Sequence, residues 1–143
     1  MNYGIGSAMA ALAVVAGSLW AHHSVVAQFD YAKKLTLTGR LTKVDWRNPH
    51  IEIFVEAKGD LDKLETWGLE GWAPNAFRNA SVGKADFHNA VGQPVTVEGA
   101  RARDGSAYLL LGEIKFADGR SLKVYDLTPP GEGKQAGKQP DAQ

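Results

Sequence analysis

Histidine is the residue type in this cysteine-free chain that is best suited to bind a metal, and two of its four histidines are adjacent. They are His22 and His23, in the segment AHHSVVAQFD. If the chain is cleaved after Ala21, His22 becomes the amino terminus, and its α-amine and ring nitrogen can chelate one ion together. Amine and imidazole nitrogens suit Cu(II), which lies at the top of the divalent affinity order. The pair therefore predicts half of a metal site, with copper favoured.

His50 is the predicted third nitrogen ligand. It follows Asn48-Pro49 and has the opposite parity to Ile51, so we expect its ring to point away from the core. Glu52 shares the face of His50 and could orient its ring or ligate the ion directly. His23 is a further ligand only if the chain bends, because neighbouring side chains of an extended segment point in opposite directions. The alternative is that the pair is a solvated tail and that His50 only donates to a loop carbonyl.

A second interpretation involves no metal. Trp46 and Phe54 have the opposite parity to the Leu/Ile face, and an aromatic face of a small barrel can bind a peptide, a glycan or a protein. Sixteen basic and sixteen acidic side chains give no net charge, which argues against nucleic-acid binding. The chain has no Ser-His-Asp arrangement that can be argued, no phosphate loop and no placed pair of carboxylates, so no catalytic residue is predicted.

Residues 1–21 are predicted to be a signal peptide. They carry no charged side chain, Met9–Trp20 form an apolar run, and Ala21 is a small residue suited to cleavage. A cut after Ala27 and an uncleaved anchor are the alternatives. With no cysteine, neither a disulfide nor a lipid anchor can form. We therefore expect a periplasmic protein that is free of the membrane after cleavage, with a small ligand or another periplasmic protein as its partner.

The rest of the chain reads as one mainly β domain. Residues 22–34 are predicted to be a linker that carries the histidine pair, 35–128 a barrel, and 129–143 a disordered tail rich in Gly and Pro. Alternation of apolar and polar residues predicts six strands, at 35–46, 50–57, 64–71, 94–102, 106–117 and 121–125. One short helix is expected at 73–81, followed by a loop at 83–93. A change of parity near Thr42 and Lys43 predicts a bulge in the first strand.

This element order favours a small closed barrel of five to six strands, similar to the OB fold, with the helix between strands three and four. An open antiparallel sheet or a small sandwich is the alternative architecture.

Several of these segments together resemble a small exported bacterial family of unknown function. The resemblance spans about residues 21–125 and rests on Ala-His-His-Ser at 21–24, Phe29-Asp30 and Trp-x-Asn-Pro-His at 46–50, with Pro-Asn at 74–75 and more generic Asp-Gly turns. It implies export, and it implies no activity. Any chemical activity therefore has to be inferred from the residues themselves.

Overall fold

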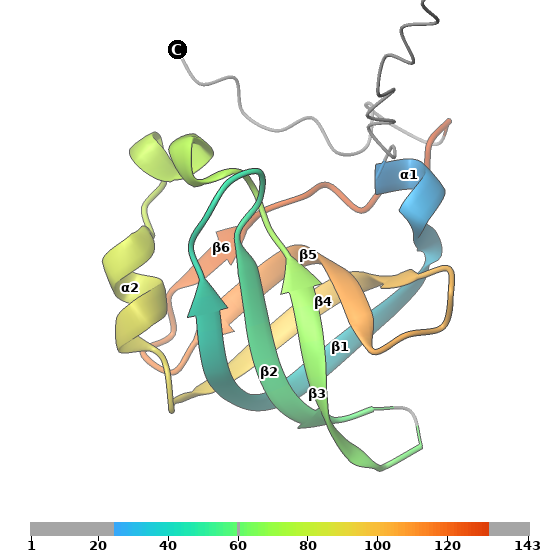
Figure 1. The fold of residues 1–143 in the computed structure, drawn as a ribbon, viewed down its shortest axis with the longest axis horizontal. Helices are drawn as coiled ribbons and strands as arrows, with labels where there is room; N and C mark the ends of the chain where they lie inside the picture. The colour runs from blue at the N-terminus through green and yellow to red at the C-terminus, as the bar shows by residue number, and fades with distance from the viewer. Residues whose placement is uncertain (1–24, 60, 132–143) are drawn as a thin grey trace, which may run out of the picture.

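The described chain is built mainly from β-strands, as Figure 1 shows for the computed structural model, which describes residues 25–59 and 61–131. The strands are β1 (Phe29–Asp45), β2 (Glu52–Lys58), β3 (Leu64–Glu70), β4 (Pro94–Ala102), β5 (Tyr108–Phe116) and β6 (Ser121–Lys123). Three short helical segments accompany them: α1 (Val25–Gln28), η1 (Pro74–Asn79) and α2 (Lys84–Asn89).

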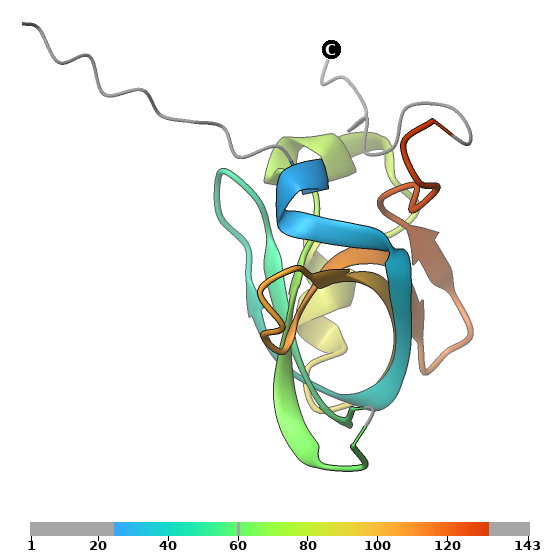
Figure 2. The same ribbon diagram turned by 90° about the vertical axis from the view of Figure 1, so that its right-hand side faces the viewer.

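Five of the strands close into a ring, which is best seen in Figure 2. The sheet order is β3-β2-β1-β4-β5-β6, and a parallel pairing of β3 with β5 completes the ring. The long β1 makes this possible because its first part pairs with β4 and its last part with β2. The predicted small closed barrel is confirmed, and the open antiparallel sheet is wrong. The comparison with the OB fold in particular stays a prediction.

The bulge predicted in the first strand is present, since the register of β1 on β2 shifts between Leu41 and Lys43. At the shift, the Thr42 hydroxyl donates to the carbonyl of Phe54 over 3.1 Å. Leu41 and Val44 are both buried, so the extra residue is what lets both parities face the core.

The predicted linker at 22–34 is wrong from Val25 onward, because α1 and the first residues of β1 occupy that stretch. Phe29 and Tyr31 alternate into the core, where both are almost fully buried. A second register shift, between Asp30 and Lys34, separates them from the remainder of β1. Two buried aromatic rings outweigh the mixed polarity of this segment, which is why it pairs with β4 instead of remaining a linker.

Two helical segments, not one, lie between β3 and β4. The predicted helix at 73–81 is present as the 3-10 helix η1, but the stretch 83–93, predicted as a loop, contains α2. A helix of six residues is too short to show an apolar period in the sequence. It forms because Phe87 inserts fully into the core.

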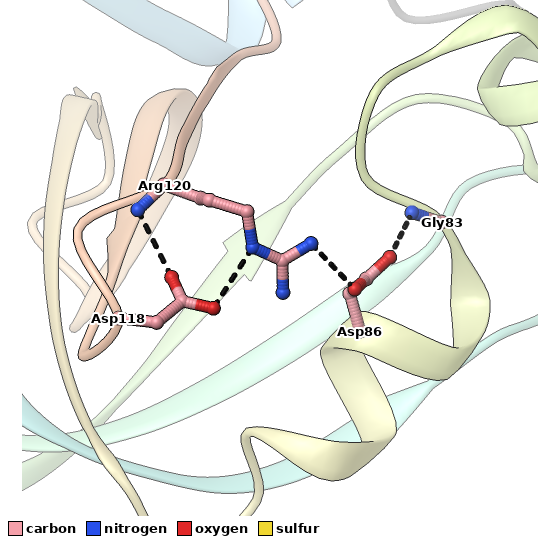
Figure 3. A network of polar contacts seen from close by, with 4 residues as sticks. All are labelled: Gly83, Asp86, Asp118 and Arg120. Carbon is pink, nitrogen blue, oxygen red and sulfur yellow. Dashed lines mark hydrogen bonds and ion pairs between the residues drawn. The ribbon is translucent and has the colours of Figure 1, made fainter.

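Helix α2 is fastened to the β5–β6 turn by the polar network in Figure 3. One Asp86 carboxylate oxygen accepts from the Gly83 backbone N–H at 2.9 Å and the other from the Arg120 guanidinium at 2.8 Å. Arg120 also donates from Nε to Asp118 at 2.8 Å. The backbone N–H of Gly83 and the guanidinium of Arg120 hold the pKa of Asp86 below its ordinary value.

The chain after β6 returns along the barrel. The backbone N–H groups of Val124 and Tyr125 donate to the carbonyls of Gly112 and Leu111 at 2.7 and 3.2 Å. Leu127 is buried over Gly112. The core therefore includes side chains as far along the chain as Leu127. The predicted signal peptide at 1–21 and most of the predicted tail at 129–143 lie outside the described residues.

Candidate functional site

The histidine pair His22 and His23 lies outside the described residues, and the described chain starts at Val25, in α1. Arg103 holds this short helix to the β4–β5 connection. Its backbone N–H donates to the carbonyl of Gln28 at 2.9 Å, and its Nε donates to that of Val26 at 3.4 Å. Arginine donors satisfy carbonyls that a helix end leaves without partners. The chain that follows the histidine pair is therefore attached at a defined place.

His50 lies in the connection between β1 and β2, and the backbone on its carboxyl side is firmly held. The Ile51 N–H donates to the Trp72 carbonyl and the Ile51 carbonyl accepts from the Gly71 N–H, both at 2.9 Å. These bonds extend the β2–β3 ladder past the ends of both strands. The side chain of Ile51 is fully buried, as its parity predicted. The His50 side chain, by contrast, keeps 35% of its surface exposed.

The side chain in contact with the His50 ring is Glu70, the last residue of β3. Its Oε1 lies 3.0 Å from His50 Nδ1, and only 14% of the Glu70 side chain is exposed. Burial raises the pKa of the Glu70 carboxyl, and the Glu52 charge raises it further, while His50 acts in the opposite direction. The result is a half-exposed imidazole that a largely buried carboxyl group orients through one nitrogen.

Glu52 lies directly across from Glu70 in the β2–β3 register, and it is hydrogen-bonded to the Tyr108 hydroxyl. The sequence predicted Glu52 as the partner of His50, and Glu70 takes that position instead. Burial raises the pKa of Tyr108 strongly, and the bond to Glu52 adds to the effect, so the phenol is neutral and donates. The Tyr108 ring in turn stacks on Phe29, with the ring centroids 6.0 Å apart.

Two more buried tyrosines lie near Glu70. The Tyr125 hydroxyl donates to the Gly71 carbonyl at 3.2 Å, and the Glu70 charge, after burial, raises the pKa of Tyr125. The Tyr31 hydroxyl is buried and has no hydrogen-bond partner within the described part of the chain. Its pKa is also raised, chiefly by burial.

Sequence reasoning missed Glu70 and the tyrosines because their meeting depends on strand register. The one available signal was parity, since Glu70 lies on the opposite face of its strand from the buried Leu69.

The two aromatic residues predicted as a possible ligand face, Trp46 and Phe54, are both half-buried and have different neighbours. Trp46 packs against the Phe77 and Phe87 rings, with centroids 4.8 and 5.5 Å away, and belongs to the partly buried margin of the core. Phe54 lies on the barrel wall beneath the Lys43 ammonium group, 5.0 Å from its ring centroid. Trp46 therefore packs at the margin of the core, against rings of η1 and α2.

Taken alone, the described residues do not complete a metal site. Across 25–59 and 61–131, no three His, Cys, Asp or Glu side chains are grouped so that they could hold an ion. His50 and Glu70 offer one ring nitrogen and one carboxylate. In the same residues, no helix is both long and apolar enough to cross a bilayer.

Comparison with known proteins identifies a family. Residues 9–110 match the Family of unknown function DUF6152, a span that includes the histidine pair, His50 and Glu70. No curated protein and no solved structure matches the chain. Because the match covers well over half of the sequence, the chain belongs to the DUF6152 family.

Proposed function

We propose that this protein is exported to the periplasm and binds copper there. In this proposal the amine and ring of His22 and the ring of His50 ligate the ion, and His23 is a further ligand. Glu70 is the observation that carries the proposal. The Glu70 carboxyl oxygen lies 3.0 Å from Nδ1 and orients the ring through that nitrogen, so in this proposal Nε2 is the nitrogen that ligates the ion. This is the usual arrangement of a histidine that ligates a metal.

A series of contacts links the start of β1 to His50. This supports a single site formed by His50 and the histidine pair that precedes β1. Phe29, which follows α1, stacks on Tyr108, and Tyr108 is bonded to Glu52. Glu52 faces Glu70, and Glu70 contacts His50. Both Figure 1 and Figure 2 draw α1 and the β1–β2 connection along the same upper side of the molecule. His22 lies three positions before Val25, and an extended chain of that length covers about 10 Å.

The shortage of ligands in the barrel is part of the reasoning. A tight site needs three or more donors, and in this proposal the described residues supply one ligand, the His50 ring, which Glu70 orients. Amine and imidazole nitrogens from a new amino terminus would complete the set. The affinity would then depend on cleavage at Ala21, so protein that keeps its signal peptide would bind copper weakly.

The test uses protein exported to the periplasm, so that the natural amino terminus forms. Mass spectrometry identifies that terminus, and Cu(II) is then titrated into the parent, His22→Ala and His50→Ala. We expect a terminus at His22 and one tightly bound Cu(II) in the parent. Each substitution should lower the affinity by at least about a hundredfold, since each removes a direct ligand worth several kcal/mol.

His88→Ala is the matched control, because it removes an exposed imidazole from α2, outside the proposed site. It should leave copper binding unchanged. The proposal is wrong if the parent binds Cu(II) weakly, or if His88→Ala and His50→Ala lower the affinity equally. A terminus at Gln28, or an uncleaved chain that still binds tightly, would remove His22 from the ligand set.

A further inference from the structure

The first half of β3 is an open edge of the sheet. Strand β3 starts at Leu64, but its pairing with β5 includes only Gly68, Leu69 and Glu70. The residues before Gly68 pair with β2 alone. This end of the β2–β3 hairpin projects at the lower end of the molecule in Figure 1 and Figure 2. Within the part of the chain that the structure describes, residues 64–67 therefore have no strand on their second side.

The direction of the backbone groups along this edge follows from the hydrogen bonds of the hairpin. The Gly59 N–H donates to the Lys63 carbonyl at 3.2 Å. Bonded pairs alternate along an antiparallel ladder, so the odd-numbered residues of β3 bond to β2 and the even-numbered residues point the other way. Gly68 agrees, because its N–H donates at 3.0 Å to the carbonyl of the residue before β5. The N–H and C=O groups of Leu64 and Thr66 therefore point to the open side.

The side chains at this edge are suited to a protein contact. Leu64 is 59% exposed and Leu61, in the preceding turn, is 90% exposed. They are two of the three large apolar side chains that are exposed among the described residues. Lys63 and Glu65 lie on either side of Leu64 and carry opposite charges. Unpaired backbone groups beside exposed apolar side chains are a template for pairing with another strand.

We infer that this edge pairs with the same edge of a second copy of the chain, in an antiparallel register centred on Leu64. A two-fold axis then places the two Leu64 residues opposite each other, so that their N–H and C=O groups exchange two hydrogen bonds. Lys63 of each copy faces Glu65 of the other. These are non-hydrogen-bonded pairs, in which opposite side chains lie closest, so two attractive charge pairs flank the centre of the interface.

The charges select this register among those that the outward backbone groups allow. If Leu64 faced Thr66, the two Glu65 side chains would lie directly opposite each other, and like charges in that position destabilise a sheet. A register centred on Thr66 would need the N–H of Gly68, which is already bonded within the barrel. Of these three registers, the one centred on Leu64 combines available backbone groups with opposite charges.

The experiment measures the association state of the exported protein by sedimentation equilibrium. No metal takes part in the contact, so the protein is first treated with EDTA, and failure of the copper proposal would leave the result unchanged. We expect the parent to change from monomer to dimer between about 0.01 and 1 mM, because so small an interface is weak. A parent that stays monomeric up to about 1 mM would overturn the inference and leave the edge to a strand of a different protein.

Reversing one charge in each copy tests the register. Lys63→Glu places two glutamates opposite each other, and Glu65→Lys places two lysines opposite each other. Each variant alone should therefore dimerise about tenfold more weakly than the parent. Mixed together, the two variants should form a heterodimer about as stable as the parent dimer, because every glutamate then faces a lysine. If the mixture associates no better than the separate variants, the register is wrong.

Two further variants complete the comparison. Lys115→Glu makes the same charge reversal at an exposed residue of β5, between β4 and β6, so it should leave dimerisation unchanged. Leu64→Pro removes the outward N–H at the centre of the interface, and proline is tolerated as the first residue of a strand. It should abolish the dimer, while circular dichroism verifies that each variant has folded. A dimer that survives Leu64→Pro would use another surface and would overturn the inference.

Discussion

Gly39 lies in close contact with the backbone of β2, and Gly39→Ala tests whether β1 and β2 pair as described. Gly39 pairs with Ala57 of β2 on one side and with Val95 of β4 on the other. Propensity alone would favour the substitution, because glycine within a strand costs about 0.5–1 kcal/mol relative to alanine. The packing around Gly39 predicts the opposite effect, a loss of stability.

The contacts of an added Cβ determine how large this loss of stability should be. A Cβ added at Gly39 would collide with the Glu56 carbonyl oxygen and would lie 2.7 Å from the Cβ of Ala57. Ordinary contact starts at 3.4 Å, and real Cβ atoms essentially never come closer than 3.0 Å. The Glu56 carbonyl oxygen belongs to the hydrogen-bonded backbone of β2, so it can move away only if β1 and β2 separate. Overpacking costs about 1–3 kcal/mol, and a rigid backbone obstacle puts this case at or above the upper value, about 3 kcal/mol.

The assay is urea unfolding at 25 °C, followed by tryptophan fluorescence. We expect Gly39→Ala to lower the free energy of unfolding by about 3 kcal/mol or more, with an unchanged m value. Gly83→Ala is the control, because its added Cβ meets nothing within 4 Å and its φ of −129° suits alanine. Because Gly83 is the residue that starts α2, Gly83→Ala should lower the free energy of unfolding by less than about 1 kcal/mol. If Gly39→Ala were as stable as the parent, β1 and β2 could not be paired in this register.

Two further predictions concern α2. Phe87→Ala should lower the free energy of unfolding by about 3–5 kcal/mol because a fully buried ring is lost, while Leu61→Ala, at a residue 90% exposed, should change it by less than about 0.5 kcal/mol; urea unfolding measures both. Asp86→Ala should cost about 1 kcal/mol at pH 7, because it removes the bonds to Gly83 and Arg120. The pKa of Asp86 is lowered in the folded protein, so its contribution to stability is complete above pH 3.8 and is lost as the pH falls through the folded pKa. The difference in unfolding free energy between Asp86→Ala and the parent should therefore disappear below that pH in acid unfolding. A difference that stays constant with pH would contradict this account.

Local chemistry accounts for the features that the sequence predicted correctly. Alternation along each strand is imposed by the backbone geometry of that strand alone, so the buried positions of Ile51, Ile53 and Val55 follow from their spacing. The parity change near Thr42 predicted the bulge for the same reason. The wrong predictions, at residues 25–34 and at α2, concern segments whose structure depends on distant parts of the chain. Each segment is too short or too mixed to show a period, and each is held by aromatic rings that insert into a core built by distant strands.

For the candidate site, the sequence by itself determined where the two histidine elements lie in the chain and the outward parity of His50. Only the tertiary structure decided which carboxylate meets that ring. Register links Glu70 to Glu52 and brings it to His50, and it also leaves Glu52 bonded to Tyr108. Core packing likewise decided that Trp46 lies against Phe77 and Phe87. The physical reason is that side-chain periodicity is a property of one strand, whereas a pairing register is a property of two strands and of the core that both must cover.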